Sequence, residues 1–337
     1  MNSSEIIWRC PSNIALVKYW GKKDIQIPCN PSLSLTLSNS YTEVKLVLGP
    51  KRKKEIEAEY FFHGEPNDTF KQRIIKYLSA NHDYFSVLED HSISIHSENS
   101  FPHSAGIASS ASSFGAIALA LLSASTHKTD FFKEASFLAR LGSGSACRSM
   151  YAPYALWGKL NSIEHSSDEF AIPVKNIHSD FENLQDTILI VDDSVKKVSS
   201  SLGHSLMNGH VYAQARFKQA SAHCDQLLNV LQSGDKQRFI SIIEKEALAL
   251  HAMMMTSEDY FILMKPGTLQ LIDKIIDFRK ESGTFICFTL DAGPNIHLLY
   301  RKQDAELVTD FIHKELSNSV INVIYDHAGG GPQKVTA

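Results

Sequence analysis

The strongest chemical pattern in the sequence is a loop of serine and glycine that runs into small apolar residues, at positions 101–122. Gly106 can adopt backbone angles that are closed to other residues, so neighbouring amides can converge on a ligand. A helix that begins within positions 108–111 would direct its free N–H groups and its positive dipole end into the loop, which favours an anion. Three hydroxyls add donors at the same place: those of Ser104, Ser109 and Ser110. A serine-rich cap before a core helix explains this loop equally well, and the loop matches neither a P-loop nor a dinucleotide-binding fingerprint.

Three other segments carry side chains that suit an anionic substrate. Lys18 and Lys22 flank a Tyr-Trp-Gly sequence at the expected end of a strand, where ammonium groups can meet phosphate and aromatic rings can shape a wall. A second Gly/Ser loop, 142–150, contains Arg148, whose guanidinium can hold a carboxylate or phosphate through two parallel hydrogen bonds. Asp291 follows an expected strand and precedes a Gly-Pro turn, where a catalytic carboxylate would lie. By residue type alone, an Asp that initiates the turn is the simpler explanation.

Composition describes an ordinary globular chain of 337 residues, with 43% hydrophobic and 21% charged residues. A net charge of −4 gives no reason to expect nucleic acid or an anionic membrane as a partner. The five scattered cysteines are odd in number and never spaced C-x-x-C, which favours reduced thiols in the cytoplasm. The N-terminus lacks the features of a signal peptide, and no apolar run reaches the ~18 residues that a membrane span needs. Neither the histidine spacing nor the adjacent pair Asp192 and Asp193 indicates a metal site or an acid/base pair.

The elements that must position these residues follow from hydrophobic periodicity. Strands are expected at 5–10, 13–19, 30–38, 91–96, 187–193, 284–290, 296–300 and 320–325. Residues 41–48 and 55–62 are expected to pair as a hairpin around the basic turn 51–54. Helices are expected at 69–80, 130–140, 205–233, 236–255, 268–282 and 303–317. The alternation of helix and strand in the last third predicts an α+β arrangement with a mixed sheet, and we expect residues 329–332 to cap the last strand.

Four separated motifs resemble one enzyme family in order and spacing, over nearly the whole chain. They are Asn13-Ile-Ala-Leu-Val-Lys-Tyr-Trp-Gly-Lys22, Gly106-Ile-Ala-Ser-Ser-Ala111, Gly142-Ser-Gly-Ser-Ala-Cys-Arg-Ser149 and Asp291-Ala-Gly-Pro-Asn295. Together they resemble the kinase superfamily that includes galactokinase, homoserine kinase, mevalonate kinase and phosphomevalonate kinase. Within it they look like the mevalonate diphosphate decarboxylase family. The second motif indicates only the superfamily, whereas the first and third together are specific to the decarboxylase branch.

The resemblance implies an α+β fold with an N-terminal domain like ribosomal protein S5 domain 2 and a ferredoxin-like C-terminal domain. The active site would lie in the cleft between them. We expect an ATP- and substrate-binding domain at residues 1–190 and the ferredoxin-like domain at 191–337. The implied reaction converts ATP and (R)-5-diphosphomevalonate to isopentenyl diphosphate, CO2, ADP and phosphate, with Mg²⁺ as the metal. Family members are commonly homodimers, which we adopt as an expectation.

The resemblance also implies roles for individual residues. Asp291 would accept or orient the proton of the substrate's 3-hydroxyl, Arg148 would hold its carboxylate, and Lys18 would be a further lysine of the cleft. Diphosphomevalonate would contact Tyr19, Trp20, Gly21, Lys22, Ser143, Gly144, Ser145, Ala146, Cys147, Arg148 and Ser201. The ATP phosphates would contact Pro102, His103, Ser104, Ala105, Gly106, Ile107, Ala108, Ser109 and Ser110. No metal ligand is assigned.

The sequence departs from the family at one place. Family members often carry an arginine after the turn at Gly64 that contacts the substrate's phosphates, and here the nearest residues are Phe70, Lys71 and Arg73. A decarboxylase acting on phosphomevalonate, or a kinase that only phosphorylates mevalonate, therefore stays an alternative. A catalytically inactive binding relative predicts damage to the 101–110 loop or to Asp291, and neither is damaged.

Overall fold

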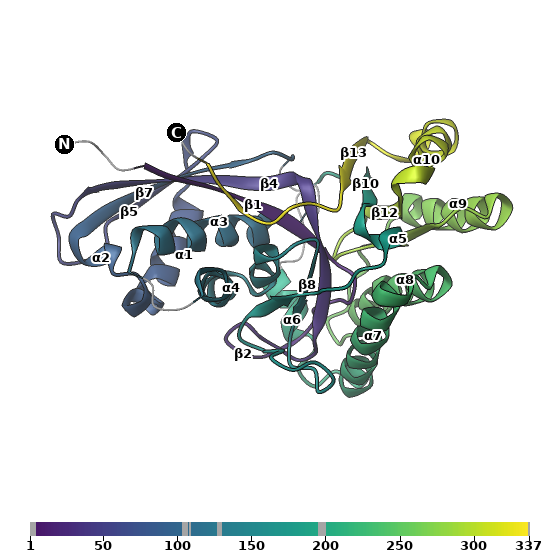
Figure 1. Ribbon diagram of the computed structural model, residues 1–337, viewed down its shortest axis with the longest axis horizontal. Helices are drawn as coiled ribbons and strands as arrows, with labels where there is room; N and C mark the ends of the chain where they lie inside the picture. Colours follow the sequence, from purple (N-terminus) through teal and green to yellow (C-terminus); the bar gives the residue numbers. More distant parts are fainter. Residues whose placement is uncertain (1–4, 103–106, 108, 127–129, 195–199, 336–337) are drawn as a thin grey trace.

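The structure is a computed structural model that describes residues 5–102, 107, 109–126, 130–194 and 200–335. Figure 1 shows two lobes side by side, each a sheet with helices packed against it. An eight-stranded sheet forms the first lobe and a four-stranded sheet the second, with a two-stranded ribbon beside them. This arrangement agrees with the α+β fold that the sequence predicts.

In the first lobe the strand order is β14-β1-β4-β7-β5-β6, and β8 joins β4 to β9. These strands are β1 (Glu5–Ala15), β4 (Ser32–Pro50), β5 (Ala58–Phe62), β6 (Glu65–Pro66), β7 (His91–Asn99), β8 (Tyr154–Trp157), β9 (Ala171–Pro173) and β14 (Gln333–Val335). The ribbon consists of β2 (Lys22–Asp24) and β3 (Ile27–Pro28). The helices are α1 (Asp68–Ala80), α2 (Val87–Asp90), α3 (Ser109–Ala124) and α4 (Phe131–Gly142), with the 3-10 turns η1 (His82–Tyr84) and η2 (Gly144–Met150).

Helix α3 forms the centre of this lobe because its residues are small. It is buried from Ala111 to Leu122, where it packs against β1, β4 and α4. α4 approaches so closely that a Cβ on its last residue, Gly142, would lie 1.9 Å from a ring carbon of Phe114. The close packing of α3 and α4 therefore sets where η2, which follows α4 directly, can lie.

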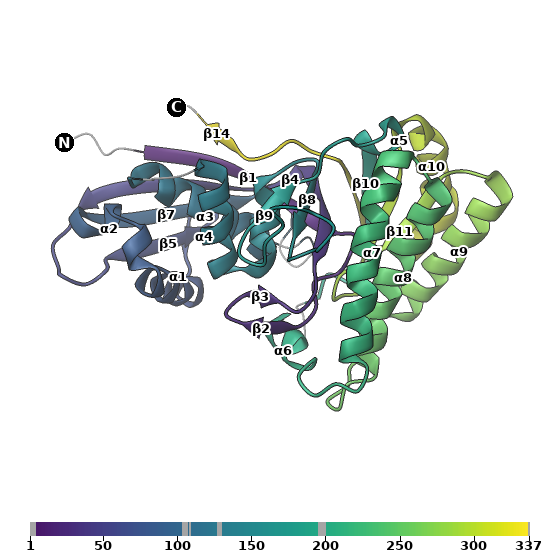
Figure 2. The same cartoon turned by 60° about the horizontal axis from the view of Figure 1, so that its bottom comes forward.

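The second lobe is an antiparallel sheet in the order β11-β12-β10-β13. Its elements are α5 (Ser179–Glu182), β10 (Leu184–Ile190), α6 (Ser200–Ser205), α7 (Ala213–Ser233), α8 (Lys236–Met255), α9 (Pro266–Ser282), β11 (Ile286–Thr289), β12 (Ile296–Arg301), α10 (Ala305–Phe311) and β13 (Asn322–His327). Short turns surround α10: η3 (Lys302–Asp304), the π-helical η4 (Ile312–Leu316) and η5 (Ser317–Ser319). Figure 2 shows α7, α8 and α9 lying side by side along this lobe.

The expected helix 205–233 begins only at Ala213, the expected strands 5–10 and 13–19 form the single strand β1, which ends at Ala15, and 30–38 and 41–48 form the single strand β4.

Three further differences concern how the strands pair and where the fold ends. The predicted hairpin is wrong: β4 and β5 lie on opposite sides of β7, the first antiparallel and the second parallel to it. Ile93 and Ile95 of β7 are buried and alternate with more exposed residues. A strand of this kind suits the interior of the sheet better than an edge. The mixed sheet consequently lies in the first lobe rather than the second. Residues 329–332 do not end the fold, since β14 follows and pairs with β1.

The two lobes are joined at a corner of β4. Residues 32–35 pair with β8 and residues 42–50 with β7. On its other side β4 pairs with β1 through residues 34–36 and 41–47, and the register shift between these stretches leaves the amides of residues 38–40 without strand partners. Asp326 of β13 accepts hydrogen bonds from these three amides, those of Ser38 (2.9 Å), Asn39 (2.8 Å) and Ser40 (2.8 Å). Its side chain is buried, so the carboxylate satisfies amides that water cannot reach.

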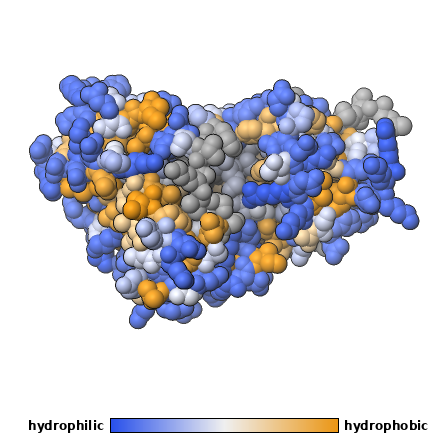
Figure 3. Space-filling view, turned by 180° about the vertical axis from the view of Figure 1, so that it is seen from behind, coloured by the Kyte–Doolittle hydropathy of each residue, from blue (hydrophilic) through white to orange (hydrophobic). Residues whose placement is uncertain are grey.

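Charged and polar side chains predominate on the face shown in Figure 3, where apolar surface residues form separate patches. Within the described ranges, no helix combines the length and apolar character needed to cross a lipid bilayer.

The change Asp326→Asn should lower the free energy of unfolding by about 2–3 kcal/mol, because one carboxylate oxygen becomes an NH2 group that faces a backbone N–H. Urea unfolding of the purified variant measures this loss. Asp310→Asn is the control, since its ion pair with Lys314 is exposed and should contribute less than about 0.5 kcal/mol. Equal losses in the two variants would contradict the role of Asp326.

Candidate active site

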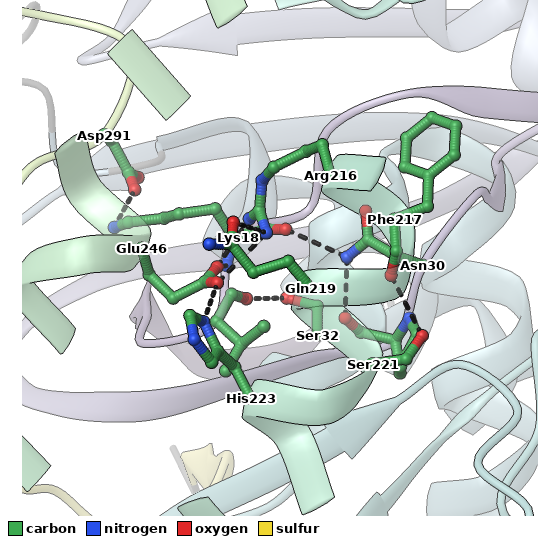
Figure 4. A network of polar contacts seen from close by, with 12 residues as sticks. Lys18, Asn30, Ser32, Arg216, Phe217, Gln219, Ser221, His223, Glu246 and Asp291 are labelled. Atoms are coloured by element: carbon green, nitrogen blue, oxygen red, sulfur yellow. Dashed lines mark hydrogen bonds and ion pairs between the residues drawn. The ribbon is translucent and has the colours of Figure 1, made fainter. Parts of the chain in front are cut away.

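An ion pair between Lys18 and Asp291 marks the centre of the site. Lys18 follows β1 and Asp291 follows β11, so the pair joins the two lobes, with 2.9 Å between Nζ and Oδ1 (Figure 4). The lysine side chain is 2% exposed and the aspartate side chain 31% exposed. Burial lowers the pKa of Lys18, and the negative charge of Asp291 opposes this shift. The carboxylate therefore lies at the open end of the pair, where a substrate can reach it.

Arg148 is a buried cation in η2, 3% exposed. Its Nε and Nη2 donate to Oδ1 of Asn13 at 3.3 and 3.2 Å, and its Nη1 has no hydrogen-bond acceptor within the part of the chain that the structure describes. Burial lowers the pKa of the guanidinium. A buried guanidinium with an unused donor is costly unless an anion binds to it. Arg148 is therefore prepared for an anionic ligand group.

Asn13 is a site residue that sequence reasoning quoted in a motif but gave no role. Besides accepting from Arg148, its Nδ2 donates to Ser149 Oγ at 2.8 Å and to the carbonyl of Ser145 at 3.3 Å. It therefore fixes η2 and the guanidinium together. Asparagine is depleted in strands, so an Asn among the apolar residues of β1 was the available sequence signal.

Aromatic side chains form a wall next to these charges. The rings of Tyr19 and Trp20 lie 4.2 and 4.9 Å from the ring of His204 in α6. Tyr19 Oη and Trp20 Nε1 are buried, and neither has a hydrogen-bond partner among the described residues. Two unused polar groups so close to Arg148 favour a polar ligand at this wall.

His204 was not predicted from the sequence. Burial lowers its pKa to about 3, so the ring is neutral at physiological pH, and Nδ1 accepts a hydrogen bond from the amide of Gly21 at 3.0 Å. Gly21 itself has φ of +98°, and a Cβ there would lie 2.9 Å from the ring of Phe217. The turn that delivers Lys22 to the site therefore needs glycine.

Lys22 and Arg73 add positive charge beside the loop that follows α4. Burial and the charge of Arg73 lower the pKa of Lys22, and burial lowers the pKa of Arg73. Arg73 Nη2 donates to the carbonyl of Gly142 at 3.2 Å, and its guanidinium lies 4.5 Å from the ring centre of Phe114. No carboxylate of the described chain contributes to the pKa shift of either cation. The sequence left the role of Arg73 unassigned.

The second Gly/Ser loop lies in η2 as a wall of the site. Ser143 caps it, and a Cβ on Gly144 would lie 2.9 Å from Tyr19 Oη, so the two loops are in close contact. Ala146 and Cys147 are fully buried, and the Cys147 thiol donates back to the carbonyl of Gly144. Burial raises the pKa of Cys147 to about 12, so this thiol stays neutral. Ser145 keeps partial exposure and supplies the carbonyl that Asn13 contacts.

The predicted ATP loop is described only in part. His103, Ser104, Ala105, Gly106 and Ala108 lie outside the described residues, whereas Pro102, Ile107, Ser109 and Ser110 lie within them. Helix α3 begins at Ser109, and Ser110 Oγ lies 3.3 Å from Ser143 Oγ, which brings this helix start to η2. Ser201 belongs to α6, but its side chain lies outside the description.

Comparisons with known proteins agree with this geometry. Residues 10–170 match the family described as "Diphosphomevalonate decarboxylase-like N-terminal domain", and residues 187–329 match "Mevalonate 5-diphosphate decarboxylase C-terminal domain". The diphosphomevalonate decarboxylase of Saccharomyces cerevisiae is 30% identical, over 90% of this chain and 80% of that protein.

Solved structures are similar over the full length. The crystal structure of mevalonate diphosphate decarboxylase from Staphylococcus aureus superposes with a TM-score of 0.86 at 29% identity, covering 99% of each chain. A protein designated MDDEF, in complex with MVAPP, AMPPCP and magnesium, superposes with a TM-score of 0.84 at 28% identity, covering 100% of each chain. The predicted α+β fold is thereby confirmed.

The change Asn13→Ala should lower the free energy of unfolding by about 1–3 kcal/mol, because the buried guanidinium of Arg148 loses its side-chain acceptor. Urea unfolding measures the effect. Asn39→Ala is the matched control, since the exposed side chain of Asn39 donates a single hydrogen bond to the carbonyl of Tyr325. A loss no larger than that of the control would mean that Asn13 does not support Arg148.

Proposed function

This chain belongs to the diphosphomevalonate decarboxylase family, and we infer from that membership and from its site that it decarboxylates (R)-5-diphosphomevalonate with ATP. The products are isopentenyl diphosphate, CO2, ADP and phosphate. The observation that carries the inference is that Arg148 lies near the Lys18–Asp291 pair, because phosphorylation alone does not require a buried guanidinium for the carboxylate.

The first step is phosphorylation of the tertiary 3-hydroxyl, which is otherwise a poor leaving group. Asp291 accepts or orients the hydroxyl proton while the hydroxyl oxygen bonds to the γ-phosphorus and the bond from that phosphorus to ADP breaks. Lys18, held 2.9 Å from Asp291, holds this carboxylate in place. In a loose phosphoryl-transfer transition state, this positioning contributes more than basicity.

The second step is elimination. The bond between the carboxylate carbon and C2 breaks, its electron pair forms the new C2–C3 double bond, and phosphate leaves from C3 with the electrons of the C–O bond. Arg148 holds the carboxylate through its unused Nη1 donor. CO2 is neutral, so the guanidinium binds the departing group less strongly than the carboxylate, which favours release.

We propose that Lys22 and Arg73 bind the substrate's diphosphate. Both are cations beside the 142–144 loop, and no carboxylate of the described chain contributes to the pKa shift of either. Arg73 lies one helical turn after Phe70, so its guanidinium can supply the charge that the sequence left unassigned. Ser201 is a further candidate for this subsite.

The nucleotide site is proposed at the start of α3, which begins at Ser109 and where Ser110 contacts Ser143 at the start of η2. In the described ranges no three His, Cys, Asp or Glu side chains gather as metal ligands, which suits a magnesium ion held chiefly by nucleotide phosphates and water. When bound, Mg²⁺ neutralises charge on the transferring phosphoryl group.

Three further assignments are proposals of the same kind. We propose a division of labour between residues 1–190, which supply Lys18 and Arg148, and residues 191–337, which supply Asp291, with two strands crossing this boundary: β10 belongs to the second sheet and β14 to the first. We propose a cytoplasmic location, supported by five cysteines that form no disulfide. We propose a homodimer, supported by the family resemblance, and sedimentation equilibrium would test it.

Product analysis tests the function. The protein is incubated with ATP, Mg²⁺ and, in parallel, mevalonate, 5-phosphomevalonate or 5-diphosphomevalonate, and each reaction is followed for ADP, phosphate and CO2. Release of all three from the diphosphate alone supports the proposal. ADP without CO2 would mean a kinase, and turnover of the monophosphate would mean a phosphomevalonate decarboxylase.

The change Asp291→Asn should lower kcat by roughly 10²- to 10⁴-fold, because the amide cannot accept the hydroxyl proton. The dissociation constant for a non-hydrolysable ATP analogue should stay within about threefold, since the nucleotide subsite is separate. Asp193→Asn, at an exposed position, is the control. Near wild-type turnover in the Asp291 variant would exclude the assigned role.

The change Arg73→Gln should raise KM for 5-diphosphomevalonate by roughly 10-fold, because a charged hydrogen bond to phosphate is lost. KM for ATP should be unchanged, and Arg52→Gln in the exposed basic turn should affect neither constant. Steady-state kinetics with each substrate varied in turn measures both. An unchanged KM for the diphosphate would remove Arg73 from the subsite.

A further inference from the structure

One helix contacts both members of the Lys18–Asp291 pair. Glu246 of α8 accepts a hydrogen bond from the backbone amide of Lys18, 2.9 Å from Oε2. His251, five residues further along α8, contacts the backbone carbonyl of Asp291 at 3.1 Å from Nε2. Both side chains are buried, at 0% and 1% exposed. Neither residue belongs to one of the motifs described above from the sequence.

Glu246 is held as a carboxylate by two side chains of α7. Arg216 donates to both its oxygens, at 3.0 and 2.5 Å, and His223 Nδ1 lies 2.5 Å from Oε1 (Figure 4). Burial would raise the pKa of Glu246, but the hydrogen bond of His223 and the charge and hydrogen bonds of Arg216 hold it below its ordinary value. The Glu246 carboxylate thus has four hydrogen-bond contacts, two with Arg216, one with His223 and one with the Lys18 amide. Because it is charged, it binds this amide more strongly than a neutral acceptor would.

The backbone of Lys18 is fixed on its other side as well. Asn30 Nδ2 donates to the carbonyl of Lys18 at 3.0 Å, and Ser32 Oγ donates to the preceding carbonyl, that of Val17, at 2.5 Å (Figure 4). With both peptide groups anchored, the ammonium can move only through rotations of its own side chain. The place of its Nζ is therefore set by α8 and the start of β4.

His251 plays the corresponding part for Asp291. A carbonyl oxygen can only accept, so Nε2 carries the proton and donates. Burial lowers the pKa of His251 to about 4, which keeps the ring neutral with one N–H at physiological pH. The same carbonyl accepts from the Gly293 amide at 2.7 Å, which closes the turn after Asp291. His251 thus attaches this turn to α8.

We propose that Glu246 and His251 are positioning residues, which use the rigid helix α8 to set the Lys18 ammonium against the Asp291 carboxylate. This inference rests on the proposed function. Five residues of a helix span about 7.5 Å, so the two contacts lie at a fixed separation along α8. Misplacement of a catalytic group by about 1 Å can cost roughly 100-fold in rate, so such fixation has a kinetic consequence.

The test uses two variants of His251 and one of Glu246, all assayed as the full chain. His251→Leu removes the donor, whereas His251→Gln keeps an N–H at a similar reach. Glu246→Asp keeps the charge for Arg216 but withdraws the acceptor from the Lys18 amide by one methylene. Ile243→Val, buried on the same helix without a polar contact, is the control. Measurements are kcat, KM for both substrates, single-turnover ADP formation and thermal unfolding.

We expect His251→Leu and Glu246→Asp to lower kcat and the single-turnover rate by roughly 10- to 100-fold, with KM within about threefold of wild type. His251→Gln should recover most of the rate.

A merely structural role predicts a lower melting temperature with unchanged kcat below that temperature, and that result would overturn the inference. Equal rates in the Leu and Gln variants would overturn it as well. If wild-type protein releases no CO2 from 5-diphosphomevalonate, the proposed function fails and the inference with it. Normal wild-type turnover with unchanged variants overturns the inference alone.

Discussion

The structure depends on burying two positive charges, those of Lys18 and Arg148, which would be more stable in water if they had no anionic partner. Lys18 and Arg148 are both nearly inaccessible, yet among the described residues only Lys18 of the two has a carboxylate partner, and that partner belongs to the other lobe. An unpaired buried cation costs several kcal/mol of desolvation free energy. The first lobe alone would bear this cost, and contact with the second lobe and with an anionic substrate would reduce it. Binding, lobe contact and catalysis are therefore linked by the same charges.

One buried apolar cluster crosses the junction of the lobes, with Leu33 and Leu35 on one side and Phe239 on the other, and polar contacts add direction to this packing. Asp326 satisfies the amides at the corner of β4, Glu246 satisfies Lys18, and His204 satisfies Gly21. Each contact places a side chain of the second lobe on backbone of the first. Such directional bonds set orientation to a fraction of an ångström, which apolar packing alone does not specify.

Sequence reasoning singled out the groups that we propose to act on the substrate, but it did not single out the groups that hold them in place. Lys18, Arg148 and Asp291 were predicted because their local motifs resemble those of a known family, and hydrophobic periodicity predicted most helices and strands. Glu246 could not be predicted from the sequence, because it lies 228 residues from its partner, Lys18, on a helix with no distinguishing motif. The parallel pairing of β5 with β7 was missed for a similar reason, because a short basic turn favours a hairpin locally while burial of β7 decides the register globally. Tertiary burial thus overrides local pattern at both places.

The return of β14 to β1 has a topological consequence. The chain leaves the first sheet after β9 and re-enters it at Gln333, so the second lobe is inserted in the first and tethered at both ends. Two crossings restrict relative motion of the lobes far more than a single linker does, since a free swing about one hinge would stretch the other connection. The double tether also keeps the lobes at a high effective concentration, so their mutual docking loses little entropy.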